Sequence, residues 1–305
     1  MQFKNDIRHP LLTWRAMDKL PYINVFTKRN FLDANINDLR FITNLSEDEI
    51  IRIKDDLSLF VDLEPHVYRE VGITHLDTFL GGGLRVGHVY EICGQTEAGK
   101  SKLCQTICLR LAQRGIGSFY VDLDGGLVPR DLLNMLTNVQ EEDSPSTILK
   151  LIRFQRIRDV DSLKKVLEFI IDQKCALKQF GFLVVDSIAH FHILSLDDNR
   201  EVQRENYRKL EECYKLMHLL AKKCKFTVFL TNLLLTNAND SRIQGASFNI
   251  GLKIDEKFPD FPFTRIRIEV ARTDTGIERK LSVLRSSYID AKATESVQLT
   301  NEGFI

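Results

Sequence analysis

The sequence has no excess of charge of either sign and no long apolar run. Lys and Arg total 42 of the 305 residues, Asp and Glu also total 42, and the formal net charge is zero. Proteins that hold nucleic acid through their overall charge are basic, so any such contact here must be local. No run reaches 18 apolar residues, and residues 1–6 lack the apolar core of a secretory signal. We therefore expect neither a membrane-spanning helix nor such a signal.

Cysteine motifs that bind metal are also missing. The six cysteines are scattered and form no Cys-x-x-Cys pair. Cys104 and Cys108 stand four residues apart on an expected helix, but no His or Cys pair lies nearby to complete a metal site. This usage is typical of reduced thiols in an intracellular protein.

The residues that are present divide the chain into two parts. Residues 1–66 predict a small helical domain and linker. Ser46 and Glu49 have the spacing of a capping box, in which a Ser and a Glu three residues later satisfy the first amides of a helix. Apolar residues at helical spacing follow, and Pro65 ends the pattern.

Residues 67–305 predict an α/β core. Short apolar runs alternate with helical stretches, which favours a mainly parallel sheet covered on both faces. Residues 265–270 alternate between polar and apolar, and with residues 281–284 they predict an antiparallel hairpin at the sheet edge. The expected parallel strands are residues 89–93, 118–122, 151–154, 182–186 and 226–231, and the expected helices are residues 100–113, 129–136, 161–173 and 202–223.

Residues 94–101, Gly-Gln-Thr-Glu-Ala-Gly-Lys-Ser, match the phosphate-loop pattern GxxxxGK[ST] between an apolar strand and a helix. Its glycines let backbone amides turn inward around phosphates, and the helix directs its positive end to the same anion. Lys100 would reach the β- and γ-phosphates, and the Ser101 hydroxyl would bind Mg²⁺. The expected nucleotide-binding residues are Gly94, Gln95, Thr96, Glu97, Ala98, Gly99, Lys100 and Ser101.

Polar residues end the neighbouring strands. Four apolar residues precede Asp186, which would hold Mg²⁺ through water. Asp122 and Asp124 follow another strand, and Thr231 and Asn232 end a third. Ligands of open α/β sheets lie beyond the carboxyl ends of the strands, so these side chains should converge on the phosphates, with Thr231 and Asn232 joining the nucleotide-binding set.

These residues resemble the RecA family, specifically its eukaryotic recombination branch. The segment that begins the family's ATPase core resembles residues 72–84, Gly-Ile-Thr-His-Leu-Asp-Thr-Phe-Leu-Gly-Gly-Gly-Leu. Residues 120–127, 183–187 and 231–232 follow in the family's order and spacing, and residues 122–127 are most like the delta-type paralogue.

The resemblance implies an ATP- and Mg²⁺-binding RecA-like core, residues 67–305, behind the small helical domain of residues 1–66. It further implies a nuclear protein that responds to DNA damage, in homologous recombination and double-strand-break repair. Such paralogues usually act inside heteromeric complexes with other recombinase paralogues and bind single-stranded DNA.

Four departures from the family pattern qualify that expectation. Asp124 replaces the family's catalytic Glu, which shortens the side chain by one methylene and predicts weak ATP hydrolysis. Leu233 replaces a Gln that links the γ-phosphate to a DNA-binding loop, and Glu97 places a negative charge inside the phosphate loop. Residues 60–63, Phe-Val-Asp-Leu, lack the Ala of the family's Phe-x-x-Ala assembly motif. Pairing with different relatives is therefore expected rather than long self-filaments.

The DNA-contacting loops of the family correspond to residues 190–203 and 234–247. Arg200 and Arg204 recur along one face of the expected helix after the first loop, and Arg242 lies in the second; guanidinium groups suit phosphate. Glu201 and Glu205 are interleaved, so a solvated, salt-bridged helix is an equal alternative.

Three other functions compete with a paralogue subunit. A self-sufficient strand-exchange recombinase is disfavoured by Asp124, Leu233 and the missing linker Ala. A scaffold with a purely structural nucleotide would keep the phosphate loop without requiring turnover. A small-molecule kinase would need an acceptor site, which the sequence does not show.

Overall fold

The computed structural model describes residues 7, 9–25, 27–58, 67–137, 145–173, 175–194, 200–236, 247–249, 263–273, 276–286, 288–290 and 292–305. The chain divides into two compact units, residues 1–65 and 66–305. None of the helices in these ranges is long and apolar enough to cross a bilayer.

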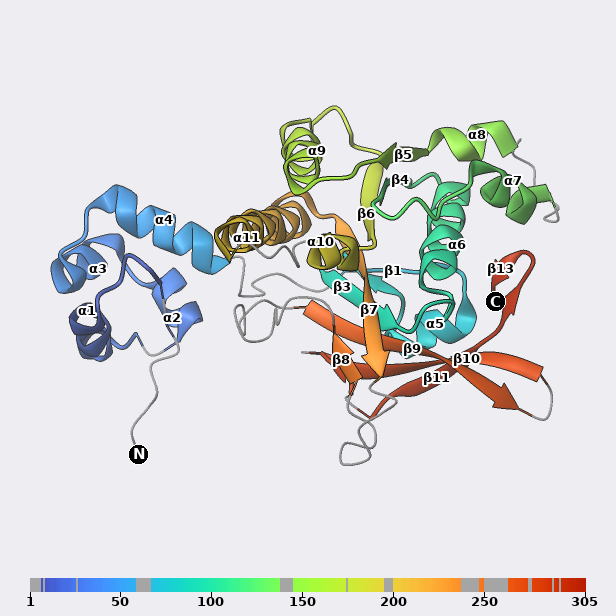
Figure 1. Ribbon diagram of the computed structural model, residues 1–305. Helices are drawn as coiled ribbons and strands as arrows, with labels where there is room; N and C mark the ends of the chain where they lie inside the picture. Colours follow the sequence, from blue (N-terminus) through green and yellow to red (C-terminus); the bar gives the residue numbers. More distant parts are fainter. Residues whose placement is uncertain are drawn as a thin grey trace. The chain divides into compact units, whose positions relative to one another are not determined.

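The first unit is a group of short helices (Figure 1). The predicted capping box is confirmed, because the Glu49 amide donates to the Ser46 hydroxyl at 3.3 Å and the Ser46 amide donates to the Glu49 carboxylate at 2.8 Å. Phe31, Leu39 and Ile50 are fully buried and form the centre of its core. The elements are α1 Trp14–Lys19, the 3-10 helix Leu20–Ile23, α2 Lys28–Asp33, α3 Ile36–Thr43 and α4 Glu47–Ser58.

The second unit is built on a large mixed sheet with the order β11-β10-β9-β3-β7-β6-β4-β5 (Figure 1). Neighbouring strands from β9 to β5 are parallel, whereas β9, β10 and β11 pair antiparallel. The predicted α/β fold with an antiparallel edge is thus confirmed. The strands are β3 Val89–Gly94, β4 Gly117–Asp122, β5 Ile152–Arg156, β6 Phe180–Asp186, β7 Thr227–Thr236, β9 Phe263–Thr273, β10 Gly276–Arg285 and β11 Thr294–Val297.

Helices cover both faces of the parallel strands. Phe182 and Val184 of β6 belong to the core cluster that includes α6, while the alternate residues Leu183 and Val185 are equally buried on the other face. Figure 1 shows α6 on one side of the strands and α9 with α11 on the other. The helices are α5 Thr74–Phe79, α6 Lys100–Gln113, α7 Pro129–Thr137, α8 Pro145–Lys150, α9 Val160–Asp172, α10 Ala189–Leu194 and α11 Arg200–Cys224.

The sheet extends one strand beyond the predicted hairpin. β9 and β10 form that hairpin, but β11 pairs with β10 on its outer side, with Leu281 opposite Glu295. The four residues of β11, Thr-Glu-Ser-Val, lack the apolar alternation that would mark them as a strand. Three short pairs complete the fold: β1 Tyr68–Arg69 with β2 Leu84–Arg85, β12 Leu299–Thr300 with β13 Gly303–Phe304, and β8 Ser247–Asn249 with β7.

Candidate nucleotide-binding site

The phosphate loop connects β3 to α6 in the middle of the sheet. Strand β3 lies between β7 and β9, so the loop emerges where flanking strands fix its start. At that start, a side chain on Gly94 would place its Cβ only 2.3 Å from the Ile268 carbonyl oxygen, so only glycine fits. A small pocket of about 60 Å³ lies beside the loop, lined by Gly94, Gln95, Ala98 and residues 267–270.

Lys100 begins α6 and reaches back over the loop. Its Nζ donates hydrogen bonds to the carbonyl oxygens of Gly94 at 3.0 Å and Gln95 at 2.8 Å. Burial lowers the pKa of this ammonium group, whereas the negative charges of Asp186 and, more weakly, Asp124 raise it. The cation therefore lies within electrostatic reach of both carboxylates and beside the positive end of a 14-residue helix.

Asp186 ends β6 and is held by two hydroxyl groups. It is buried, and the Tyr120 hydroxyl of β4 donates to Oδ2 at 2.5 Å while the Thr231 hydroxyl of β7 donates to Oδ1. Burial, and next the charge of Asp186, raise the pKa of Tyr120 well above its usual range, so the hydroxyl keeps its proton. Because β4 and β7 flank β6, the strand order itself brings the two donors to the carboxylate.

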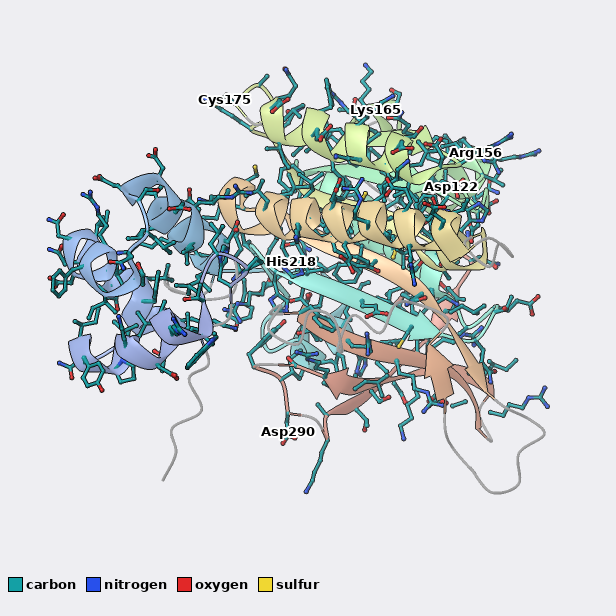
Figure 2. The ribbon with its side chains drawn as sticks, turned by 60° about the vertical axis from the view of Figure 1, so that its left-hand side comes forward. Asp122, Arg156, Lys165, Cys175, His218 and Asp290 are labelled. Carbon is teal, nitrogen blue, oxygen red and sulfur yellow. The ribbon has the colours of Figure 1, made fainter. Side chains whose placement is uncertain are left out.

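The segment after β4 places two carboxylates differently. Asp122 is buried and accepts the Gly125 amide at 2.7 Å, and the Arg156 guanidinium of β5 lies against Gly125 and 3.9 Å from the Asp122 Oδ2 atom (Figure 2). Asp124 is exposed and accepts the Gly126 amide at 3.3 Å. Asp122 thus holds the turn, and the exposed carboxylate of Asp124 is accessible to a ligand near Lys100.

Asn232 is engaged within the sheet. Its side-chain amide donates to one Glu91 carboxylate oxygen at 2.7 Å, and its oxygen accepts the Leu233 amide at 2.9 Å. The other Glu91 oxygen accepts from Arg265 at 2.8 Å, and both charged side chains are buried. One polar network therefore joins strands β7, β3 and β9. Its only sign in the sequence is Glu91, a charged residue within an otherwise largely apolar strand.

The predicted magnesium ligands fit a phosphate-bound ion. Ser101 and Asp186 lie at the start of α6 and the end of β6, where hydroxyl and carboxylate oxygens suit Mg²⁺. In the described part of the chain, no three His, Cys, Asp or Glu side chains gather to form a metal cage. Mg²⁺ in nucleotide sites takes one or two protein oxygens together with phosphate oxygens and water, and Ser101 and Asp186 would supply those protein oxygens.

The candidate DNA-contacting arginines have different settings. Arg200 opens α11, Arg204 is exposed on it, and Arg242 lies outside the described residues. One turn on from Arg204, Arg208 forms ion pairs with Glu205 at 2.8 Å and Glu212 at 2.7 Å. This part of α11 therefore has the salt-bridged character that the sequence left as an alternative.

A model of the Rad51 family matches residues 66–255, more than half of the chain. The chain belongs to the Rad51 family. The RecA-like core predicted from the sequence is thereby confirmed, and the delta-type subtype stays a prediction.

Individual Rad51-family relatives are distant. DNA repair protein rhp57 of Schizosaccharomyces pombe is 24% identical over 216 residues, which are 63% of this chain and 60% of that protein. Meiotic recombination protein DMC1 of Saccharomyces cerevisiae is 25% identical over 235 residues, 71% of this chain and 69% of that protein. DNA repair protein XRCC3 of Bos taurus is 28% identical over 140 residues, 41% of each. The chain thus spans well under the full length of each of these relatives.

Proposed function

We propose that this Rad51-family chain binds ATP with Mg²⁺ and acts in homologous recombination and the repair of DNA double-strand breaks in the nucleus, as a subunit of a heteromeric complex of recombinase paralogues. One observation carries the proposal: the Lys100 cation, the start of α6 and the buried Asp186 carboxylate meet around one phosphate loop. The names of rhp57, DMC1 and XRCC3, which describe DNA repair and recombination proteins, support the biological setting.

Each residue of the site has a distinct part. The loop amides and Lys100 bind the phosphates, and residues 94–99 shape the loop around them. Ser101 and Asp186 hold Mg²⁺, which neutralises phosphate charge when bound. Asp124 accepts a proton from the attacking water, and its short reach makes hydrolysis weak. Thr231 acts indirectly, because its hydroxyl donates a hydrogen bond to Asp186.

The proposal of a heteromer rests on Glu97. This residue adopts a left-handed conformation with φ +63° and is exposed in the phosphate loop. A carboxylate beside a phosphate site repels phosphate unless it points outward into solvent or meets a cation. We favour the cation, with a different paralogue as its source. The linker at Phe60, which lacks the Ala of the assembly motif, lies outside the described residues, and only its sequence supports the heteromer.

The site is tested by titrating ATP with Mg²⁺ into the full chain in a calorimeter. Lys100→Ala should weaken binding at least about tenfold, because the phosphates lose their main protein cation. Lys102→Ala is the matched control, since Lys102 lies two residues further along α6 and pairs with Asp131 at 3.5 Å. Equal affinities of Lys100→Ala and wild type would refute the assignment of the loop.

The assembly is tested by light scattering and electron microscopy on the purified chain. We expect a monomer or poorly behaved protein at micromolar concentration and no regular filaments on single-stranded DNA with ATP. Regular homopolymers would instead support a self-sufficient recombinase.

Single-turnover hydrolysis with and without single-stranded DNA separates a weak DNA-dependent ATPase from a scaffold. For a scaffold, DNA would have no effect on the hydrolysis rate.

A further inference from the structure

Two side chains far along the sequence contact the last residues of the phosphate loop. Arg279 of β10 donates from Nε to the Ala98 carbonyl oxygen at 3.0 Å. The ring of Phe304, in β13, lies against Gly99: a Cβ added to Gly99 would be 3.1 Å from its Cζ atom. Phe304 is fully buried. The loop is thus supported at both residues that precede Lys100.

The hairpin that carries Phe304 is itself fixed to α6. The Phe304 amide donates to the Thr106 hydroxyl at 3.1 Å, and that hydroxyl donates to the Lys102 carbonyl oxygen at 2.8 Å. β12 and β13 pair Leu299 with Phe304. Figure 1 shows β13 near the lower part of α6. Hydrogen bonds of its backbone therefore fix the position of Phe304, in addition to the packing of its ring.

We propose that Phe304 and Arg279 are positioning residues for nucleotide binding, which act by holding the phosphate loop in its binding conformation. The inference rests on the proposed function. Gly99 has φ +103°, and a glycine loses more conformational freedom on being fixed than any other residue. A loop fixed by Phe304 and Arg279 before the ligand arrives does not lose that freedom on binding, so affinity rises through preorganisation.

The two contacts supplement each other. Arg279 binds the Ala98 carbonyl, which keeps this peptide group oriented, and Phe304 excludes water from the back of Gly99. In the proposed site, phosphate and Mg²⁺ contact the loop amides, Lys100, Ser101 and Asp186, and not the side chains of Phe304 and Arg279. Their loss should therefore lower nucleotide affinity while the single-turnover rate at saturating ATP stays close to that of wild type, a split that loss of Asp124 would not produce.

The test measures the affinity of the full chain for a fluorescent ATP analogue with Mg²⁺, together with its melting temperature without nucleotide. Phe304→Ala should lower affinity about tenfold, and Phe304→Leu should restore most of it, because a branched apolar side chain can still cover Gly99. Leu167→Ala is the matched control: Leu167 is equally buried but lies in α9, on the other side of the sheet from α6 (Figure 1), so its truncation lowers the melting temperature but leaves affinity unchanged.

Each outcome decides the proposal. Wild-type affinity in Phe304→Ala overturns it while leaving the proposed function intact. An equal loss of affinity in Leu167→Ala also overturns it, by showing a general effect of instability. A wild-type chain that binds no nucleotide overturns the proposed function and this inference together. Should Phe304→Ala fail to fold, Arg279→Met decides: an affinity reduced about threefold supports the role, and an unchanged affinity overturns it.

Discussion

The end of β6 and the segment after β4 each present a carboxylate to the candidate site, but the two are held in opposite ways. Asp186 is buried and accepts from the hydroxyls of Tyr120 and Thr231. Asp124 is exposed and accepts the Gly126 amide at a long 3.3 Å. A carboxylate fixed from both sides suits a constant position beside a metal, whereas a loosely held one suits movement toward water.

The difference follows from the topology. β6 lies inside the sheet, so strands on both sides supply donors to its last residue. The segment after β4 has left the sheet, and its turn is held through Asp122 instead. The two regions should therefore respond differently to substitution: Asp186 through stability and metal binding together, Asp124 through turnover alone.

Asp186→Asn should have the largest effect. The amide group of Asn cannot accept both hydroxyl donors, which leaves one buried donor unpaired and costs about 1–3 kcal/mol in the free energy of unfolding. The lost charge should also abolish Mg²⁺-dependent ATP turnover. Thermal denaturation and single-turnover assays measure both.

Asp122→Asn is the matched control, because Asp122 is equally buried and lies opposite Asp186 in the register of β4 and β6. If Asp122→Asn abolished Mg²⁺ dependence while Asp186→Asn did not, the metal assignment would be reversed.

Asp124→Ala should affect turnover without affecting stability. As an exposed substitution it should change the free energy of unfolding by no more than about 0.5 kcal/mol. Loss of the proton acceptor should lower the single-turnover rate about 100-fold, whereas Asp124→Glu should preserve or raise it, because the longer side chain restores the reach of the family's base. Hydrolysis by Asp124→Ala at the wild-type rate would transfer the role to Asp122.

Sequence reasoning located the groups that act within one local pattern. The phosphate loop and the Asp at the end of an apolar strand are short contiguous signals, and the strand order placed them as expected. The partners that hold them were not found, because hydrogen bonds join Tyr120 to Asp186 across 66 residues and Arg279 to Ala98 across 181 residues. Such pairs depend on which strands are neighbours, a property that residue spacing along one chain does not encode.

Tyr120→Phe sharpens the comparison with a smaller change. It removes one of the two hydroxyl donors to Asp186, so we expect a loss of about 1 kcal/mol in the free energy of unfolding and a modestly higher Mg²⁺ requirement. Tyr214→Phe is the control: its hydroxyl is also buried but has no hydrogen-bond partner among the described residues, so its removal should be neutral or stabilising. Chemical denaturation of both variants measures the difference. Equal losses would show that the Tyr120 hydroxyl contributes nothing specific to Asp186.

The smallest effects are expected on α11, where Arg204 and Arg208 lie one turn apart and Arg208 forms two ion pairs. Arg208 lies between Glu205 and Glu212, and exposed ion pairs of this kind contribute little to stability. Its guanidinium is already neutralised locally, so Arg208→Ala should leave single-stranded DNA binding nearly unchanged. Arg204→Ala should weaken binding and reduce the salt dependence of the binding constant by about one charge, if Arg204 contacts phosphate. Fluorescence anisotropy at several salt concentrations measures both slopes. Identical slopes for Arg204→Ala and wild type would leave α11 as a solvated, salt-bridged helix, and the DNA-contacting role would then fall to the remaining residues of the candidate loops, 190–203 and 234–247.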